Sequence, residues 1–271
     1  MLENKVSNST LQLLGCQSKM PVINSGGGYS MLNPEHLLTP FEASALPRGP
    51  WLVFAPHADD ETYGMGGSLL KARDEKVDIH LVVLTDGALG GDSDDLVNVR
   101  REEIQQAAAM LNASSLQLWE EPDRGLSLRP ELVSRIAKVI EESAPASVFL
   151  PGPLELHPDH RMTAQLVWLA LQSIEEAERP VAYSYEIGVQ NPVNLFIDIS
   201  GQRQDKEALM AIYGSQNSEN NYEDLVVALD KGRTFTLGPE VSHAEGFYQF
   251  STQQLQRSLK EVTHEIVDLY F

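Results

Sequence analysis

The chain alternates between short apolar runs and longer segments in which apolar residues recur every three or four positions. Short, nearly unbroken apolar runs are typical of strands that are buried on both faces of a parallel sheet. They lie at residues 51–55, 77–84, 116–119, 147–150 and 181–187. Helical spacing occupies the segments between them, at residues 67–76, 98–112, 130–143 and 160–178. This alternation predicts an α/β fold with one parallel sheet and helices on both faces.

The two ends of the chain depart from this alternation. Beyond residue 191 the pattern predicts a strand at 194–199, helices at 206–213 and 222–229, strand or loop at 241–250, and a closing helix at 253–270. Residues 1–48 have scattered apolar positions and loop-like runs of Ser, Asn and Gly, with one short helix expected at 33–38. We predict a single domain over 49–271 with C-terminal additions, preceded by an N-terminal extension over 1–48. The extension is either partly disordered or an oligomer contact, so a homo-oligomer is one expected state.

The charge balance narrows the classes of partner. The 271 residues include 20 Lys and Arg against 39 Asp and Glu, which gives a formal charge of −19. Nucleic acids and anionic membrane surfaces bind basic faces, so both are disfavoured. A neutral or weakly charged small-molecule substrate fits this balance better, although solubility alone is the simpler explanation of the acidity.

Cysteine content and hydropathy bear on the compartment. Cys16 is the single cysteine, so no intrachain disulfide forms, which fits a reducing compartment. Leu13 to Cys16 faintly resembles a lipoprotein cleavage site, but the residues before it are too polar for a signal peptide. No apolar run approaches the roughly 18 residues that a membrane span needs. We expect a cytoplasmic protein with no membrane span.

Two clusters of His and Asp follow two of the predicted strands. His57, Asp59 and Asp60 come directly after the strand at 51–55, and the sequence from His157 to His160 follows the strand at 147–150. Ligands of open α/β sheets bind at the carboxyl ends of the strands, so the two clusters are expected to form one site. A catalytic zinc takes three protein ligands and leaves a fourth position open. Two imidazoles and one carboxylate from these clusters meet that need.

The residue types also suggest roles around such a metal. His57, Asp60 and His160 are the candidate ligands, and Asp59 is then free to act as a general base on a water whose pKa the metal lowers. His157 is a candidate hydrogen-bond donor to a developing oxyanion, with Asp159 holding its orientation. Taken alone, Asp59 and Asp60 are equally typical of a solvated turn or a helix cap. The second cluster is what favours the metal.

These motifs resemble the LmbE/PIG-L family of zinc-dependent N-deacetylases over residues 51–250. The resemblance is carried by the run from Pro56 to Glu61 with Gly66 and Gly67, by Leu84 to Gly87, by His157 to His160, by the helix around Arg100, by Asp198 to Ser200 and by Ala244 to Phe247. Two departures stand out. Ala58 replaces the usual Pro, and Glu155 and Leu156 occupy the approach to the second cluster where some members place a Tyr.

The resemblance implies a Rossmann-like fold, Zn²⁺ or another divalent metal, and removal of an acetyl group from an N-acetylglucosamine-type amino sugar. It implies these roles by position: His57, Asp60 and His160 as metal ligands, Asp59, His157 and Asp159 as catalytic residues, and Arg100 and Asp123 as substrate contacts. Two alternatives stay open. One is a deacylase of another amide, such as a secondary metabolite or a thiol-cofactor precursor. The other is a non-catalytic carbohydrate-binding protein with the same fold.

Some polar residues have simpler explanations than chemistry. Arg100 is as typical of a structural ion pair with Glu103 as of a substrate contact, since side chains three residues apart on a helix meet. The position of Glu61 favours a role in supporting the turn or interacting with the helix dipole over a catalytic role. The remaining histidines lack a motif and are interpreted as structural or surface residues: His36, His80, His243 and His264. Gly64 to Gly67 does not match the spacing of a dinucleotide fingerprint, so NAD is not expected.

Overall fold

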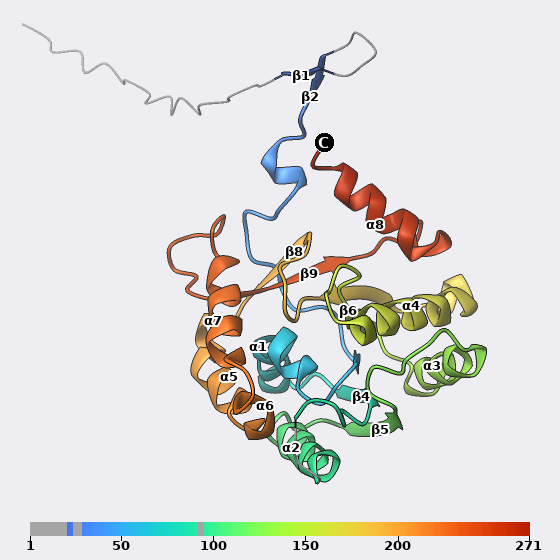
Figure 1. Cartoon of the computed structure of the whole chain (residues 1–271). Helices are drawn as coiled ribbons and strands as arrows, with labels where there is room; N and C mark the ends of the chain where they lie inside the picture. Colours follow the sequence, from blue (N-terminus) through green and yellow to red (C-terminus); the bar gives the residue numbers. More distant parts are fainter. Residues whose placement is uncertain (1–20, 24–28, 92–94) are drawn as a thin grey trace, which may run out of the picture.

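The computed structural model of the chain describes residues 21–23, 29–91 and 95–271 (Figure 1). Cys16 and the rest of residues 1–20 and 24–28 of the predicted extension lie outside the described residues. Within the extension, β1 (Pro21–Ile23) pairs antiparallel with β2 (Tyr29–Met31), and a 3₁₀ turn, η1 (Glu35–Leu37), occupies the predicted short helix. The proposed division of the chain at residue 48 stays a prediction.

The core is a mixed sheet of seven strands in the order β5-β4-β3-β6-β7-β9-β8. The strands are β3 (Trp51–Ala55), β4 (Ile79–Thr85), β5 (Ser115–Glu121), β6 (Ser147–Pro151), β7 (Val181–Tyr185), β8 (Leu195–Asp198) and β9 (Ala244–Gln249). The first five in this order are parallel, as the alternation predicts. The C-terminal additions make the sheet mixed, because β9 runs antiparallel to both β7 and β8. The α/β fold is confirmed.

Helices cover both faces of the sheet. One face carries α1 (Asp60–Asp74), α2 (Leu96–Met110), α5 (Arg203–Met210), α6 (Gly214–Asn217) and α7 (Tyr222–Gly232), and the other carries α3 (Pro130–Ser143), α4 (Pro158–Ser173) and α8 (Leu259–Asp268) (Figure 1). β3 shows why two cores form: Trp51 and Val53 point into the first core, and Leu52 and Phe54 into the second. Successive side chains of a strand alternate between faces, so a fully apolar strand supplies both.

Strand order places a crevice next to β3. The chain passes from β3 through α1 to β4 on one side, whereas β6 lies on the other side of β3. The sheet therefore changes direction of growth between β3 and β6, and ligands of such sheets bind outside the carboxyl ends of the strands at this point. Both predicted His/Asp clusters follow these two strands.

Helix α1 begins seven residues earlier than the sequence predicts. The glycines that suggest a break instead allow close packing, because a Cβ on Gly64 would lie 2.3 Å from the backbone oxygen of Glu186. The helix is kinked at Met65 (φ −147°), and the freed amides of Gly67 and Ser68 donate to the Glu245 carboxylate at 2.7 Å each. A carboxylate from β9 therefore acts as a cap within the helix.

Several other boundaries also shift. α4 ends at Ser173, before the predicted 178, and a separate 3₁₀ turn, η2 (Glu176–Glu178), follows. The closing helix α8 begins at Leu259 with a capping box between Ser258 and Glu261, and η4 (Gln254–Gln256) precedes it. A further 3₁₀ turn, η3 (Ser200–Gln202), leads into α5. Among the described residues, no helix is long and apolar enough to cross a bilayer.

Candidate active site

The first cluster sits on a strained turn between β3 and α1. Asp59 has φ 132°, a conformation that L side chains rarely adopt. Its carbonyl accepts the amides of Thr62 and Tyr63 at 2.9 and 2.8 Å, and its own amide donates to Glu61 Oε2 at 3.2 Å. Strain of this kind persists where surrounding contacts enforce it, and it is typical of functional sites. The turn points His57, Asp59 and Asp60 into one buried space.

The second cluster opens helix α4. His157 is the N-cap residue, and its Nδ1 accepts the Asp159 amide at 3.3 Å. Pro158 starts the helix, where its missing amide costs nothing. Arg161 Nη1 donates to the carbonyls of Glu155 and Leu156 at 2.8 and 2.6 Å, which holds the loop between β6 and α4.

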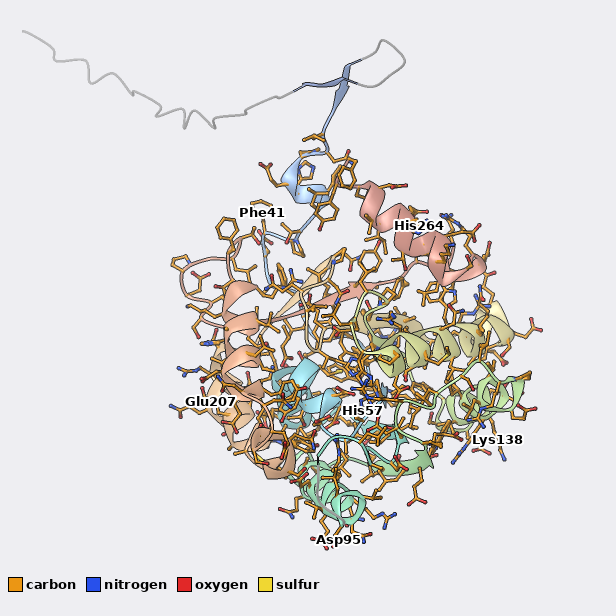
Figure 2. All side chains as sticks on the ribbon, viewed as in Figure 1. Phe41, His57, Asp95, Lys138, Glu207 and His264 are labelled. Atoms are coloured by element: carbon orange, nitrogen blue, oxygen red, sulfur yellow. The ribbon has the colours of Figure 1, made fainter. Side chains whose placement is uncertain are left out.

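The structure brings the two clusters together as the sequence predicts. The ring centroids of His57, His157 and His160 lie 4.7 to 5.4 Å apart in pairs. Figure 2 shows His57 near the middle of the molecule, between the helices of the two faces. Asp60 bridges two of the rings: Oδ2 lies 3.0 Å from His57 Nδ1, and Oδ1 lies 3.3 Å from His160 Nε2.

These atoms fit a divalent cation. Ligand atoms at about 2.1 Å around a tetrahedral zinc lie roughly 3.4 Å from one another, close to both separations at Asp60. Two sets of side chains also offer ligand atoms that all lie within 4.8 Å of one another: His57, His157 and His160, and His57, Asp123, His157 and Asp159. Asp60 belongs to neither set, although it contacts two of the imidazoles. The cluster could therefore hold a metal in more than one arrangement.

Carboxylates lie behind both candidate imidazole ligands. His57 Nε2 is 3.3 Å from Asp123 Oδ1 and 3.3 Å from Asp159 Oδ2. Within the described part of the chain, His160 Nδ1 has no hydrogen-bond partner, and Glu155 Oε2 is 3.6 Å from it. A metal-ligating His usually donates its second ring N–H to a carboxylate, which fixes its tautomer. His57 follows this pattern, and Glu155 is the carboxylate next to the second nitrogen of His160.

Asp159 and Asp123 share a contact that the sequence did not indicate, because both carboxylates lie against His57. The Asp159 carboxylate accepts the amides of Arg124 and Leu126 at 2.6 and 3.4 Å and contacts His57. Among the described residues it makes no hydrogen bond to the His157 ring, which it was expected to orient. Asp123 also lies against His57, although it lines the cavity as a substrate contact would.

Arg100 pairs with Asp59 and not with Glu103. Its Nη2 donates to the Ala58 carbonyl at 2.8 Å and lies 3.3 Å from Asp59 Oδ2, with the side chain fully buried. Glu103 instead accepts the amide and hydroxyl of Ser215 at 2.8 and 2.7 Å. Gly87 (φ 63°) makes room for the guanidinium, since a Cβ there would lie 2.6 Å from Arg100 Nε.

Burial and neighbouring charges shift the pKa values of the clustered side chains in different directions. Burial raises the pKa of Asp59 to about 7, although the charge of Arg100 opposes it. Burial acts the same way on Asp60, but the charge and hydrogen bond of His160 and the hydrogen bond of His57 outweigh it and hold the Asp60 pKa far below its usual range. Burial, with the charges of His57 and His160, lowers the pKa of His157 to about 4. Neighbouring carboxyl groups with such different pKa values are typical of acid–base sites.

Residues 52–171 match the model of the family described as PIG-L, GlcNAc-PI de-N-acetylase. This match covers less than half of the chain, and the matched segment is called the PIG-L domain. The PIG-L domain includes β3 to β6 and both His/Asp clusters.

Relatives of the PIG-L domain bear deacetylase names. A probable N-acetyl-alpha-D-glucosaminyl L-malate deacetylase 2 of Bacillus anthracis is 32% identical over 145 residues, 49% of this chain and 64% of that protein. The chain thus matches less than two thirds of that relative. Diacetylchitobiose deacetylase of Thermococcus kodakarensis is 27% identical over 198 residues, 64% of this chain and 72% of that protein. The N,N'-diacetylchitobiose deacetylase structure from Pyrococcus horikoshii shares the fold, with a TM-score of 0.67, 23% identity, and coverage of 75% and 84%.

A cavity of about 750 Å³ opens above the clusters of the PIG-L domain. Its floor includes His57, Asp59, Asp60, His157 and His160. Segments beyond the PIG-L match, at 187–189 and 216–226, also line the cavity. The cavity size is typical of a site for a small molecule.

The sequence did not identify two residues that support the PIG-L site. Tyr213 donates to Glu61 Oε1, and Glu61 in turn accepts the Asp59 amide, so a residue from the C-terminal part steadies the turn. Glu61 was expected to support the turn, but its partner is 152 residues away. Glu155 accepts the amides of Ile187 and Gly188 at 2.9 and 3.2 Å and fastens a cavity wall. Both contacts involve a buried carboxylate, that of Glu61 or that of Glu155. The burial of a carboxylate cannot be predicted from the sequence.

The histidines without a motif lie apart from the cluster. His80 Nδ1 pairs with Ser115 Oγ at 2.8 Å, and His243 Nδ1 with Ser242 Oγ at 3.0 Å. Both bonds satisfy a ring within the fold, in agreement with a structural interpretation.

Proposed function

We propose that this protein is a metal-dependent hydrolase that removes the acetyl group from an N-acetylated amino sugar of the N-acetylglucosamine type. The observation that carries the proposal is the contact of Asp60 with both imidazoles, beside the buried carboxyl group of Asp59, at the floor of one cavity. The PIG-L domain and the names of its relatives support this class of substrate.

His57, Asp60 and His160 would hold the cation, and zinc suits two imidazoles and a carboxylate. When bound, it supplies Lewis acidity and brings the pKa of a water to near 7. Asp123 and Asp159 orient His57, and Glu155 lies behind His160. This assignment gives Asp123 a positioning role in place of the expected contact with the sugar.

Asp59 is the proposed general base. It takes a proton from the attacking water, whose oxygen bonds to the acetyl carbon. It then returns that proton to the nitrogen as the C–N bond breaks, so the products are acetate and a free amine. A carboxyl group with a pKa of about 7 suits both transfers at neutral pH. Arg100 holds the carboxylate in place through Asp59 Oδ2 and the Ala58 carbonyl.

His157 is the proposed donor to the oxyanion of the acetyl group. Its lowered pKa keeps the ring neutral at pH 7, and its Nδ1 accepts the Asp159 amide. The one proton of the neutral ring then resides on Nε2, which is free to donate. The backbone amide of Asp159 therefore does the orienting that its carboxylate was expected to do.

Metal removal with rescue tests the proposal. Exhaustive chelation should abolish acetate release from N-acetylglucosamine glycosides, and stoichiometric Zn²⁺ should restore it. Metal content measured before and after provides the control. Full turnover by the metal-free protein would refute metal dependence, and binding of a sugar with no turnover in any metal would favour a carbohydrate-binding protein. Release of another acyl group in place of acetate would favour the wider class of amide deacylases.

The cytoplasmic location and the homo-oligomer stay predictions.

A further inference from the structure

The cavity has room for more than the sugar that carries the acetamide. Its volume of about 750 Å³ lies within the range of roughly 300–1,000 Å³ that holds drug-sized ligands. The reacting groups occupy its floor, so the outer part is available for whatever is joined to the sugar. The character of that outer part therefore bears on the choice of substrate.

Two exposed leucines mark the mouth. Leu89, in the loop after β4, and Leu156, in the loop after β6, both line the cavity and are 62% and 76% exposed. The Leu89 amide donates to Asp123 Oδ2 at 3.0 Å, and Arg161 binds the Leu156 carbonyl at 2.6 Å, so the backbone of each is held. Exposed apolar side chains grouped at a cavity are typical of a ligand site. Tyr222 continues this lining from α7.

Charge at the cavity disfavours an anionic group. Among the described residues that line it, five carry carboxyl groups, two carry guanidinium groups and three, all at the floor, carry imidazoles. Arg100 is buried and engaged by Asp59 and the Ala58 carbonyl, which leaves Arg124 as the exposed guanidinium of the described lining. A phosphate or dicarboxylate usually requires several such donors. An uncharged group avoids this repulsion and covers the leucines.

We propose that Leu89 and Leu156 select substrates in which the N-acetylated amino sugar carries an uncharged, apolar aglycone. The inference rests on the proposed function, since it concerns the outer part of the same site. Burial of an alkyl or aryl group against these leucines adds binding free energy that a free sugar lacks. The same apolar surface adds no binding free energy for an anionic aglycone.

The test compares kcat/KM for three substrates: N-acetylglucosamine, its hexyl β-glycoside and its 1-phosphate. The hexyl glycoside should exceed the free sugar by about tenfold or more, and the 1-phosphate should be the poorest. Leu156→Ser and Leu89→Ser should each raise KM for the hexyl glycoside and narrow the preference severalfold. Leu128→Ser is the matched control, because Leu128 is 54% exposed and does not line the cavity.

Equal values for hexyl and free sugar, a preference for the 1-phosphate, or an unchanged preference in Leu156→Ser would overturn the inference. Absence of turnover on all three substrates would instead count against the proposed function. In that case, calorimetric binding of the hexyl glycoside still decides this inference: tighter binding than the free sugar, weakened in Leu156→Ser, supports it, and equal or undetectable binding refutes it.

Discussion

The segment that matches the PIG-L model and the part of the chain that follows it contribute differently to the site. Residues 52–171 supply the candidate ligands, base and oxyanion donor. The later part supplies cavity walls and a set of buried polar contacts to α1: Tyr213 to Glu61, and Glu245 to Gly67 and Ser68. In Figure 1, α5, α6 and α7 lie on the same side of the sheet as α1. The first region holds the candidate reactive groups, and the second contacts helix α1, which begins at Asp60.

Because of this difference, we expect the first region to determine activity and the second to determine stability. In the first region, the Asp59 backbone is strained (φ 132°), and burial raises the pKa of its carboxyl group. Those of the second region are paired, such as Lys206, whose Nζ lies 2.7 Å from Asp230 Oδ2 and 2.8 Å from Glu245 Oε1. Strain at a site has to be enforced by contacts elsewhere. Substitutions in the two regions should therefore change different measurements.

Asp59→Asn should have the largest effect, and only on activity. Loss of the base should lower kcat by about 10²–10⁴-fold, while metal content is kept. The free energy of unfolding should not fall, because burial already disfavours the charged carboxylate. Steady-state acetate release, metal analysis and urea unfolding measure the three quantities. Asp205→Asn on α5, where the side chain is 58% exposed, is the control. A rate near wild type would remove Asp59 from its role.

Lys206→Met should have the opposite profile. It leaves the carboxylates of Asp230 and Glu245 buried without their cation, so the free energy of unfolding should fall by about 3–5 kcal/mol. The kcat of the protein that remains folded should change far less than in Asp59→Asn. Urea unfolding beside Lys138→Met makes the comparison, since the Lys138 side chain is 71% exposed and its loss should cost little. Equal stability of both variants would contradict the role of the buried pair.

The sequence predicted the helices and strands that are marked by the spacing of nearby apolar residues. It also predicted which residues come together at the site. The spacing of apolar residues in 130–143 agrees with α3 at both ends, and the two His/Asp clusters meet because both follow parallel strands. The direction of β9 could not be predicted, because a short apolar run carries no sign of parallel or antiparallel pairing. The early start of α1 was missed because packing of Gly64 against Glu186 overrides the low helix propensity of glycine.

Partners of individual side chains were the least predictable feature. Arg100 has Glu103 three residues away, but the side chain reaches Asp59 across the fold. Asp159 adjoins Pro158 and His160 in sequence, yet its carboxylate contacts His57. These choices depend on rotamers and on the packing of loops from distant parts of the chain, whereas the strand ends that bring the residues together depend on topology.

Tyr213→Phe tests the link between the two regions and should have the smallest effect of the three. The variant leaves Glu61 with one hydrogen bond fewer, so the free energy of unfolding should fall by about 1–3 kcal/mol. Because Glu61 also accepts the Asp59 amide, the position of the base should loosen, and kcat should fall roughly tenfold, the equivalent of about 1.4 kcal/mol. KM and metal content should stay near wild type.

A matched tyrosine distinguishes this effect from general loss of stability. Tyr248 lies on β9, where its hydroxyl accepts a hydrogen bond from Gln254 at 3.2 Å, away from Asp59. Tyr248→Phe should leave kcat unchanged, however much it lowers the free energy of unfolding. Tyr213→Phe should lower kcat even under conditions where both variants are fully folded. If the two variants retain the same kcat, the C-terminal part stabilises α1 without positioning the base, and the two regions are independent in catalysis.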